Sequence, residues 1–172
     1  MLGALILALA EAASALFDPA TGYRVAAYRG VVVAPPPGVP RIDDAQAARE
    51  ADEGKTLVID VGPAPGASRD AGGAWYLPEP HETIPGAHWF PEVGRGPTNP
   101  VLDQWFAKGV LRLTRRSKAR PIIVFCLADC WMSWNAAWKL KRLGYTHVEW
   151  YANGVDGWRE MGRQTTIVLP EP

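Results

Sequence analysis

Apolar residues in this chain gather in short runs that alternate with stretches of helical periodicity. Strands are predicted over residues 56–61, 122–125 and 147–151, and a shorter strand follows a turn within residues 84–89. The first run is continuously apolar up to Asp60, which is typical of a parallel strand that is buried on both faces of a sheet.

Helices are predicted between these strands and after the last one, over residues 44–53, 100–116, 133–143 and 155–161. For the first helix, Asp43 is the expected N-cap and Gly54 is the expected stop. Strands that alternate with helices favour an α/β fold, in which a central parallel sheet is flanked by helices on both faces.

Segments rich in glycine and proline connect these elements. Residues 62–86 are predicted to form a long loop, and loops of this length inside a compact domain are often functional. Near the N-terminus, the run Pro35–Pro37 prevents regular strand pairing beyond Val33. These prolines end an N-terminal arm that begins after residue 15.

The composition favours a folded domain and does not indicate a strongly charged binding partner. The chain has 172 residues, which suits one domain with a terminal extension. Hydrophobic residues make up 48% and charged residues 21%, which favours a packed core over disorder. The 18 basic and 18 acidic residues cancel, so the charge balance does not indicate binding to nucleic acid or to an anionic membrane.

The N-terminus begins with an apolar run from Met1 to Ala10, and the small-residue sequence Ala13-Ser14-Ala15 follows. This pattern predicts a signal peptide over residues 1–15 that is cleaved after Ala15. The run is too short to span a bilayer, and the alternative is a short apolar helix that packs on the domain. Export would place the protein in an oxidising compartment, where two close cysteines tend to pair.

The only two cysteines lie in the segment Cys126-Leu127-Ala128-Asp129-Cys130-Trp131, between a predicted strand and a predicted helix. A strand-to-helix turn offers free backbone N–H groups and the positive end of a helix dipole, and both favour a thiolate. This turn is therefore the main candidate for chemistry in the chain.

The spacing of the cysteines suits three kinds of chemistry. The pair can cycle between dithiol and disulfide, or it can hold a structural disulfide, although closing so short a ring contributes only about 2 kcal/mol to stability. Two thiolates also bind soft metals, with His81, His88, Asp129 or Met132 as candidates for further ligands. Because two cysteines alone are a weak metal signal, no metal ligands are assigned.

Five ordered motifs resemble the rhodanese domain family. They are Leu57–Val61, Ile84–Ala87, Ile122–Cys126, the helix with Ala136-Ala137, Leu140 and Gly144-Tyr145, and Asn153-Gly154 with Trp158. The resemblance covers residues 42–162 and implies a single rhodanese-like domain, with residues 16–41 as an N-terminal extension and residues 163–172 as a C-terminal tail. In sulfurtransferases of that family the loop cysteine becomes a persulfide, and Cys126 occupies the matching position.

A narrower resemblance rests on three segments, namely Thr21-Gly22-Tyr23-Arg24, Val93-Gly94-Arg95-Gly96 and the run from Cys126 to Ala137. They look like an exported subfamily that is named for association with pyrroloquinoline-quinone-dependent (PQQ-dependent) catabolism and for a CXXCW motif. This resemblance implies a periplasmic location. It also implies an association with a quinoprotein alcohol dehydrogenase or with its cytochrome or transport partners, and a role in handling redox equivalents or a redox cofactor.

The cysteine loop departs from the sulfurtransferase pattern in three ways. Asp129 replaces the usual glycine, Trp131 or Met132 stands where arginine is expected, and the loop is one residue longer. No arginine lies between Cys126 and Lys139 to clamp phosphoryl oxygens, which excludes phosphatase activity. The carboxylate of Asp129 is expected to raise the pKa of the Cys126 thiol, in opposition to the helix N-terminus, and to repel anionic sulfur donors.

These observations predict thiol-redox or sulfur handling, with Cys126 as the nucleophile, Cys130 as the resolving thiol and Asp129 acting beside them. One alternative is a non-enzymatic module that binds a soft metal, a quinone cofactor or a dehydrogenase partner. The other is a thiosulfate-type sulfurtransferase. None of the motifs requires a cofactor.

Five further residues are candidates for binding. Trp131 follows the pair and can line a pocket or dock a partner, and Ser133 begins the predicted helix. Asp60 ends a strand at the sheet edge where α/β sites form, with a turn-capping role as the alternative. Arg95 lies between two glycines and can bind an anion or stay solvated. His88 follows the Ile-Pro-Gly-Ala turn, with a structural role as the alternative.

Overall fold

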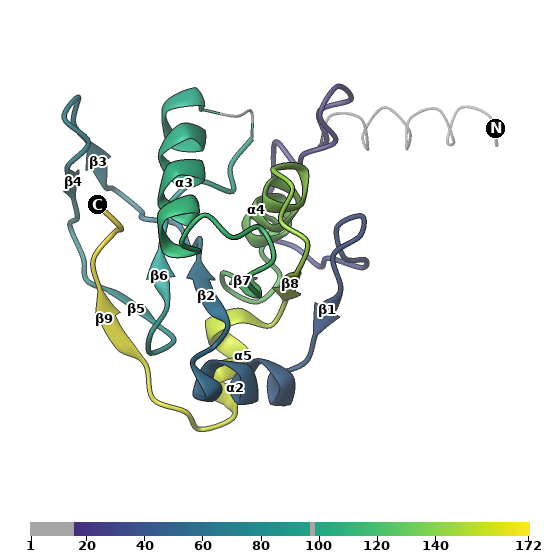
Figure 1. Ribbon diagram of the computed structural model, residues 1–172. Coiled ribbons are helices and arrows are strands. Elements are labelled where there is room, and N and C mark those ends of the chain that lie inside the picture. Colours follow the sequence, from purple (N-terminus) through teal and green to yellow (C-terminus); the bar gives the residue numbers. More distant parts are fainter. Residues whose placement is uncertain (1–15, 97–98) are drawn as a thin grey trace, which may run out of the picture.

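A five-stranded parallel sheet forms the centre of the computed structural model, which describes residues 16–96 and 99–172 (Figure 1). The strands run in the order β1-β8-β7-β2-β6, with bounds Arg41–Ile42, Val148–Tyr151, Ile122–Phe125, Leu57–Asp60 and His88–Trp89. All four pairings within this sheet are parallel. The predicted signal peptide, residues 1–15, lies outside the described residues.

Helices cover both faces of this sheet. They are α2 (Asp44–Glu53), α3 (Pro100–Leu113), α4 (Trp131–Arg142) and α5 (Gly154–Glu160). Apolar residues of α3 and α4 share one buried cluster with the strands, whereas those of α2 and α5 share the other. In Figure 1, α3 and α4 accordingly lie above α2 and α5. The prediction of an α/β fold with a parallel sheet between helices is confirmed.

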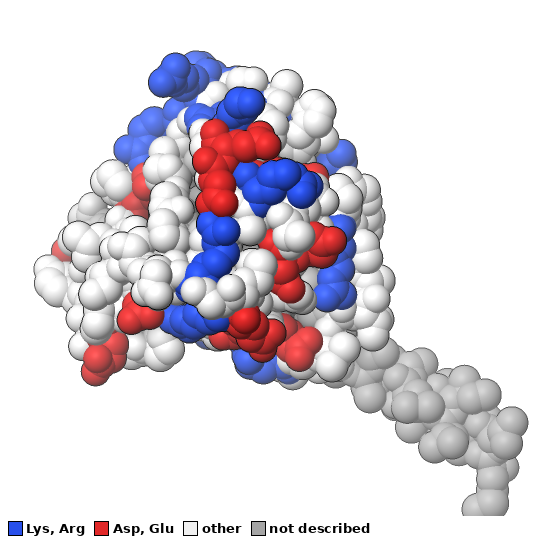
Figure 2. Space-filling model, turned by 90° about the horizontal axis from the view of Figure 1, so that it is seen from below, with Lys and Arg blue, Asp and Glu red and all other residues white. Residues whose placement is uncertain are grey.

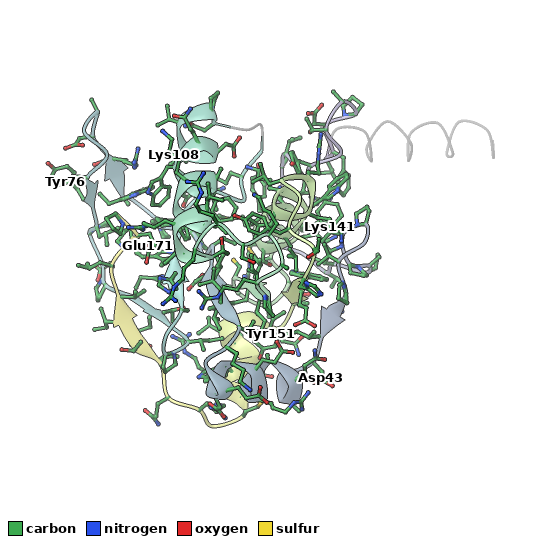
Figure 3. The ribbon with its side chains drawn as sticks, viewed as in Figure 1. Asp43, Tyr76, Lys108, Lys141, Tyr151 and Glu171 are labelled. Carbon is green, nitrogen blue, oxygen red and sulfur yellow. The ribbon has the colours of Figure 1, made fainter. Side chains whose placement is uncertain are left out.

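The first helix has the ends that its sequence predicts. The Asp43 side chain accepts a hydrogen bond from the backbone N–H of Gln46 at 2.8 Å, and Gly54 ends the helix with φ 65°. Tyr151 joins β8 to this helix, because its hydroxyl donates to Asp44 at 2.7 Å. Figure 3 shows Tyr151 above α2 and Asp43 at the start of that helix.

Two helix boundaries differ from the prediction. Helix α4 begins at Trp131 rather than Ser133, so that Cys130 is its N-cap residue. Helix α3 ends at Leu113 rather than near Arg116. Arg115 and Arg116 have φ values of 52° and 66°, which a continuing right-handed helix does not allow.

The predicted long loop over residues 62–86 contains three short strands. β3 (Ser68–Arg69) and β4 (Trp75–Tyr76) pair with each other, and β5 (His81–Thr83) pairs with β9 (Thr166–Val168) of the C-terminal segment. Strands of two or three residues are too short to show an alternating pattern in the sequence. The C-terminal segment is therefore tied to the domain, and Glu171 also pairs with Arg112 of α3.

The N-terminal extension runs along α4 and ends in β1. In its described part before β1 it makes isolated bridges, Phe17↔Arg24 and Arg29↔Cys130, and no longer strand. The buried Asn135 side chain of α4 holds this extension with three hydrogen bonds, one of which goes to the carbonyl of Gly94. Its Oδ1 accepts from the backbone N–H of Arg24 at 2.9 Å, and its Nδ2 donates to the carbonyl oxygens of Arg24 and Gly94 at 2.8 and 2.7 Å.

Charged side chains of both signs are mixed over the surface. On the face shown in Figure 2, acidic and basic groups lie beside one another, in keeping with the net charge of zero. Among the described residues, no helix combines the length and the apolar character needed to cross a membrane.

We predict that Asn135→Ala lowers the free energy of unfolding by about 2–4 kcal/mol, because it leaves buried backbone groups of the extension and of Gly94 without partners. Asn99→Ala is the matched control. It removes an exposed N-cap from α3 and should cost about 1 kcal/mol. Urea unfolding of both variants measures the difference, and equal losses would contradict a central role for Asn135.

Candidate functional site

The two cysteines meet at the carboxyl end of the sheet. Cys126 follows the last residue of β7, and Cys130 is the N-cap of α4. Their sulfur atoms lie 2.7 Å apart, both thiols are free, and the residues are only 1% and 2% exposed. The turn between strand and helix therefore holds a preformed dithiol in which Cys126 donates a hydrogen bond to Cys130.

The surroundings shift the two thiols in opposite directions. Burial raises the pKa of Cys126 well above its usual value, and its bond to Cys130 and the negative charge of Asp60 add to the shift. The pKa of Cys130 is lowered to about 7, chiefly because its sulfur accepts the hydrogen bond from Cys126. The backbone N–H of Met132 and the positive charge of Arg29 also favour its thiolate.

The two shifts favour Cys130 as the reactive thiolate of the pair. Cys126, the predicted nucleophile, occupies the strand-end position, where its raised pKa favours the protonated thiol. Cys130 stands at the positive end of α4 and is the thiolate of the pair near neutral pH.

Asp129 has a smaller electrostatic role than predicted. Its side chain is exposed, and the carboxylate that raises the pKa of Cys126 is that of Asp60. The backbone of Asp129 adopts a left-handed conformation with φ 50°, and its carbonyl oxygen accepts a hydrogen bond from Gly30. Asp129 therefore shapes the turn through its main chain.

The N-terminal extension covers this turn. Arg29 forms an antiparallel bridge with Cys130, the N–H of Gly30 donates to Asp129 at 2.9 Å, and the N–H of Trp131 donates to Tyr28 at 2.8 Å. The loop itself has no arginine, but the extension brings the charge of Arg29 to Cys130. The sequence could not show this contact, because about a hundred residues separate the two partners.

Trp131 and Ser133 belong to the packing around the first turn of α4. Trp131 is half-buried under the extension, with the Arg24 guanidinium 4.8 Å from its ring centre. The Ser133 hydroxyl is fully buried, donates to the carbonyl of Cys130 at 3.1 Å and accepts from the Trp150 indole at 2.9 Å. Ser133 thus joins the helix start to β8 and is not open to a ligand.

Asp60 anchors a separate buried cluster beside the cysteines. Its carboxylate accepts hydrogen bonds from Gly62 N–H at 2.6 Å and Thr83 Oγ1 at 2.6 Å, and it contacts His81 Nε2 at 2.7 Å. The His81 ring stacks on Trp89, with ring centres 3.8 Å apart. The turn-capping interpretation of Asp60 is confirmed by its bond to Gly62, and the sequence analysis missed His81 as its partner.

The remaining candidates lie away from the sulfur atoms. His88 contacts Glu171 at 2.5 Å, and Arg95 forms an ion pair with Glu92 while its guanidinium lies over the Tyr28 ring. Within the described residues, no group of three or more metal-ligating side chains of His, Cys, Asp and Glu occurs.

A polar hollow borders the covered turn. It has a volume of about 270 Å³, and its lining includes Val31, Arg41, Asp129, Trp150, Asn153 and Glu160. Charged groups of both signs line it. A larger hollow of about 690 Å³ lies between the β3–β4 hairpin and the start of α3, with Arg69, Trp75 and Arg95 in its wall.

Comparisons with known proteins agree with this fold. The family model described as the rhodanese-like domain matches residues 43–161. No curated protein matches the chain significantly. Among solved structures, a thiosulfate sulfurtransferase from Pseudomonas aeruginosa superposes with a TM-score of 0.50 and 16% identity, over 77% of this chain and 21% of that protein. The chain thus spans about a fifth of its length.

Two further solved structures are similar. A protein from Lactobacillus plantarum has a TM-score of 0.48 and 19% identity, over 74% of this chain and 88% of that one. A human single-domain sulfurtransferase has a TM-score of 0.45 and 18% identity, over 71% and 96% of the two chains. At these identities the comparisons with solved structures concern the fold alone.

We predict that iodoacetamide alkylates the reduced protein first at Cys130, with a rate that rises through a midpoint at about pH 7. The thiolate is the reactive form, so reactivity is present above the midpoint and is lost as pH falls through it. Arg29→Gln removes a positive charge that favours the thiolate, so its midpoint should move upwards. Peptide mapping of the labelled cysteine at each pH measures both effects.

Two controls separate the causes. Arg29→Lys keeps the charge and should leave the midpoint near that of the wild type. Cys126→Ala removes the hydrogen bond that contributes most to the shift, so it should raise the midpoint further than Arg29→Gln does. First labelling at Cys126, or a midpoint near the ordinary value of 9.0 in the wild type, would contradict the assignment of the thiolate.

Proposed function

This chain belongs to the rhodanese-like domain family, and from that premise we propose that it is a thiol-redox protein. Cys126 and Cys130 interconvert between a dithiol and a disulfide. The observation that carries the proposal is the contact of the two sulfur atoms at 2.7 Å, with one thiol as hydrogen-bond donor and the other at a helix N-terminus.

The geometry favours reversible chemistry over a structural crosslink. A disulfide has an S–S distance of about 2.0 Å, so the two sulfur atoms can bond with little movement of the main chain. The ring closed by this bond is short, and restricting it stabilises the fold by only about 2 kcal/mol. A lowered pKa at Cys130 also stabilises the reduced form, which makes the disulfide a better oxidant.

The reaction follows from the two protonation states. The Cys130 thiolate attacks one sulfur of a partner disulfide, forms a mixed disulfide and releases the other partner sulfur as a thiolate. Cys126 then loses its proton, attacks Cys130 and releases the second partner sulfur. Two electrons pass from the protein to the partner, and the proton of Cys126 passes to solvent or to a released thiolate. The reverse sequence oxidises a partner dithiol.

Sulfur transfer is the second candidate, because Cys126 occupies the position at which sulfurtransferases of this family form a persulfide. Two observations weigh against it. Cys126 is 1% exposed, and its pKa is raised, so that little thiolate is available to take sulfur from an anionic donor. No arginine of the loop faces such a donor, and Arg29 of the extension lies over Cys130 instead.

The proposed setting is the periplasm, beside a quinoprotein alcohol dehydrogenase or its cytochrome or transport partners. The apolar run and the Ala-Ser-Ala sequence before residue 16 support export. The three segments of the narrower resemblance also contact one another. Asn135 of the cysteine segment bonds Arg24 and Gly94, which belong to the other two, so the shared motifs describe one structural unit around the dithiol.

We predict that Cys126→Ser accumulates a mixed disulfide on Cys130 when it reacts with a cysteine-containing peptide disulfide, because the resolving thiol is missing. Cys130→Ser is the matched control, with the same change at the other sulfur. It should react at least about tenfold more slowly at pH 7, because its remaining thiol is protonated. Intact mass against time, with peptide mapping of the adduct, measures both rates.

Two results would contradict the proposed function. One is faster adduct formation on Cys126 in Cys130→Ser than on Cys130 in Cys126→Ser. The other is thiosulfate:cyanide turnover that Cys126→Ala abolishes and Cys130→Ala leaves intact, which would establish sulfur transfer instead.

A further inference from the structure

The part of the extension that covers the dithiol is a strap, residues 25–33, held at both ends by α4. At one end, Arg24 bonds Asn135 through its N–H and its carbonyl oxygen, and at the other the Trp134 indole donates to the carbonyl of Ala34 at 3.0 Å. Between these anchors the chain crosses the cysteine turn. Opening the strap therefore does not require the extension to leave the domain.

The strap lies on the turn as a strand would. The N–H of Gly30 donates to the carbonyl of Asp129, and the N–H of Trp131 donates to the carbonyl of Tyr28. These two bonds flank Arg29 and Cys130, which makes them a non-hydrogen-bonded antiparallel pair. Cα atoms in such a pair are about 4.5 Å apart, which is within the range of about 4.4–6.8 Å that disulfides span.

We propose that the redox partner of Cys130 is an extended polypeptide segment that carries a cysteine in a disulfide, and that it docks antiparallel on residues 129–131 in the place of the strap. The partner cysteine takes the position of Arg29. This inference rests on the proposed function and names the substrate class of the same site.

Burial of the sulfurs requires the strap to move before any partner disulfide can react. Cys126 and Cys130 are only 1% and 2% exposed, so a disulfide cannot reach either sulfur while the strap is closed. When it opens, it frees the Trp131 N–H and the Asp129 carbonyl together with Cys130. An extended polypeptide restores both hydrogen bonds, whereas a small organic disulfide restores neither.

The strap itself is built to open. Arg29, Gly30, Val31 and Val33 are exposed, with Val31 at 71%, so of residues 29–33 only Val32, at 5% exposed, is buried in the core. Gly30 has φ 145°, a conformation that other residues rarely adopt, and Ala27 has φ 46°. Besides Val32, Tyr28 restrains the strap, because its hydroxyl accepts from the N–H of Gly96 at 2.7 Å and also donates to the Gly96 carbonyl.

The covalent steps are those of the proposed function, with the partner cysteine in the position of Arg29. The Cys130 thiolate attacks the docked cysteine sulfur, the S–S bond of the partner breaks, and its distal sulfur leaves as a thiolate. Cys126 then displaces the docked cysteine as the intramolecular disulfide forms. The balance needs no reactant beyond the dithiol and the partner disulfide.

Gly30→Ala tests the proposal, because it strains the closed strap without a steric clash. A Cβ at this position meets no atom within 4 Å, but the backbone φ of 145° is one that alanine rarely adopts. The probe is an extended peptide with one cysteine, joined by a mixed disulfide to 5-thio-2-nitrobenzoate, whose release is followed by absorbance. We expect the rate at high pH, where Cys130 is fully ionised, to rise about tenfold over the wild type.

Two controls define the cause of that gain. Gly54→Ala places the same kind of strain at the end of α2, with no atom within 4 Å, and should leave the rate unchanged. A second peptide carries an N-methyl group on the residue after its cysteine, which is the place of Gly30 and its bond to Asp129. This peptide should lose most of the gain, because it cannot donate that hydrogen bond.

The outcomes separate the two proposals. Equal rates for Gly30→Ala, Gly54→Ala and the wild type would overturn the proposal that the strap must open. An equal gain in rate for the methylated peptide would overturn strand-like docking of the partner. The thiol-redox function stands in both cases. No thiolate release from any protein would overturn both. As an independent check, Arg29→Cys in a Cys126→Ser background should crosslink to Cys130 on oxidation, whereas Val33→Cys in that background should not.

Discussion

The hydrogen bond from the Cys126 sulfur to the Cys130 sulfur is the interaction on which the site depends. It exists because β7 ends at one cysteine and α4 begins at the other, so strand and helix deliver the two sulfurs to one point. The bond adds to burial in raising the pKa of Cys126, and it is the chief cause of the lowered pKa of Cys130, whose thiolate the helix N-terminus also favours.

The N-terminal extension completes the site that the domain alone leaves unfinished. Asn135 fixes it to α4 through buried hydrogen bonds, and Arg29 brings to Cys130 the positive charge that the cysteine loop lacks. The extension crosses the turn in which both cysteines are buried. One segment therefore tunes the thiolate and restricts access to it, which suits a dithiol that reacts with selected partners.

The sequence predicted the parts of the fold that local patterns encode. The buried runs of β2 and β7, the caps of α2 and the turn that carries both cysteines follow from periodicity and capping. The pairing of Asp60 with His81, the strap over Cys130 and the short strands β5 and β9 did not follow, because they arise from contacts between distant segments. The direction in which the pKa of each cysteine shifts did not follow either, since it depends on burial and on the contact between the two sulfurs.

The reduction potential of the pair tests the thiol-redox function most directly. The protein is equilibrated in thiol–disulfide buffers of graded potential, quenched with acid and alkylated, and the oxidised fraction is measured by intact mass. Because the Cys130 thiolate is stabilised and the disulfide ring is short, we expect one two-electron transition. Its reduction potential should lie well above about −300 mV, in the range of exchangeable disulfides. A disulfide that stays oxidised below that potential would be structural, and a pair that never forms an intramolecular disulfide would not be a redox couple; either result would contradict the proposed function.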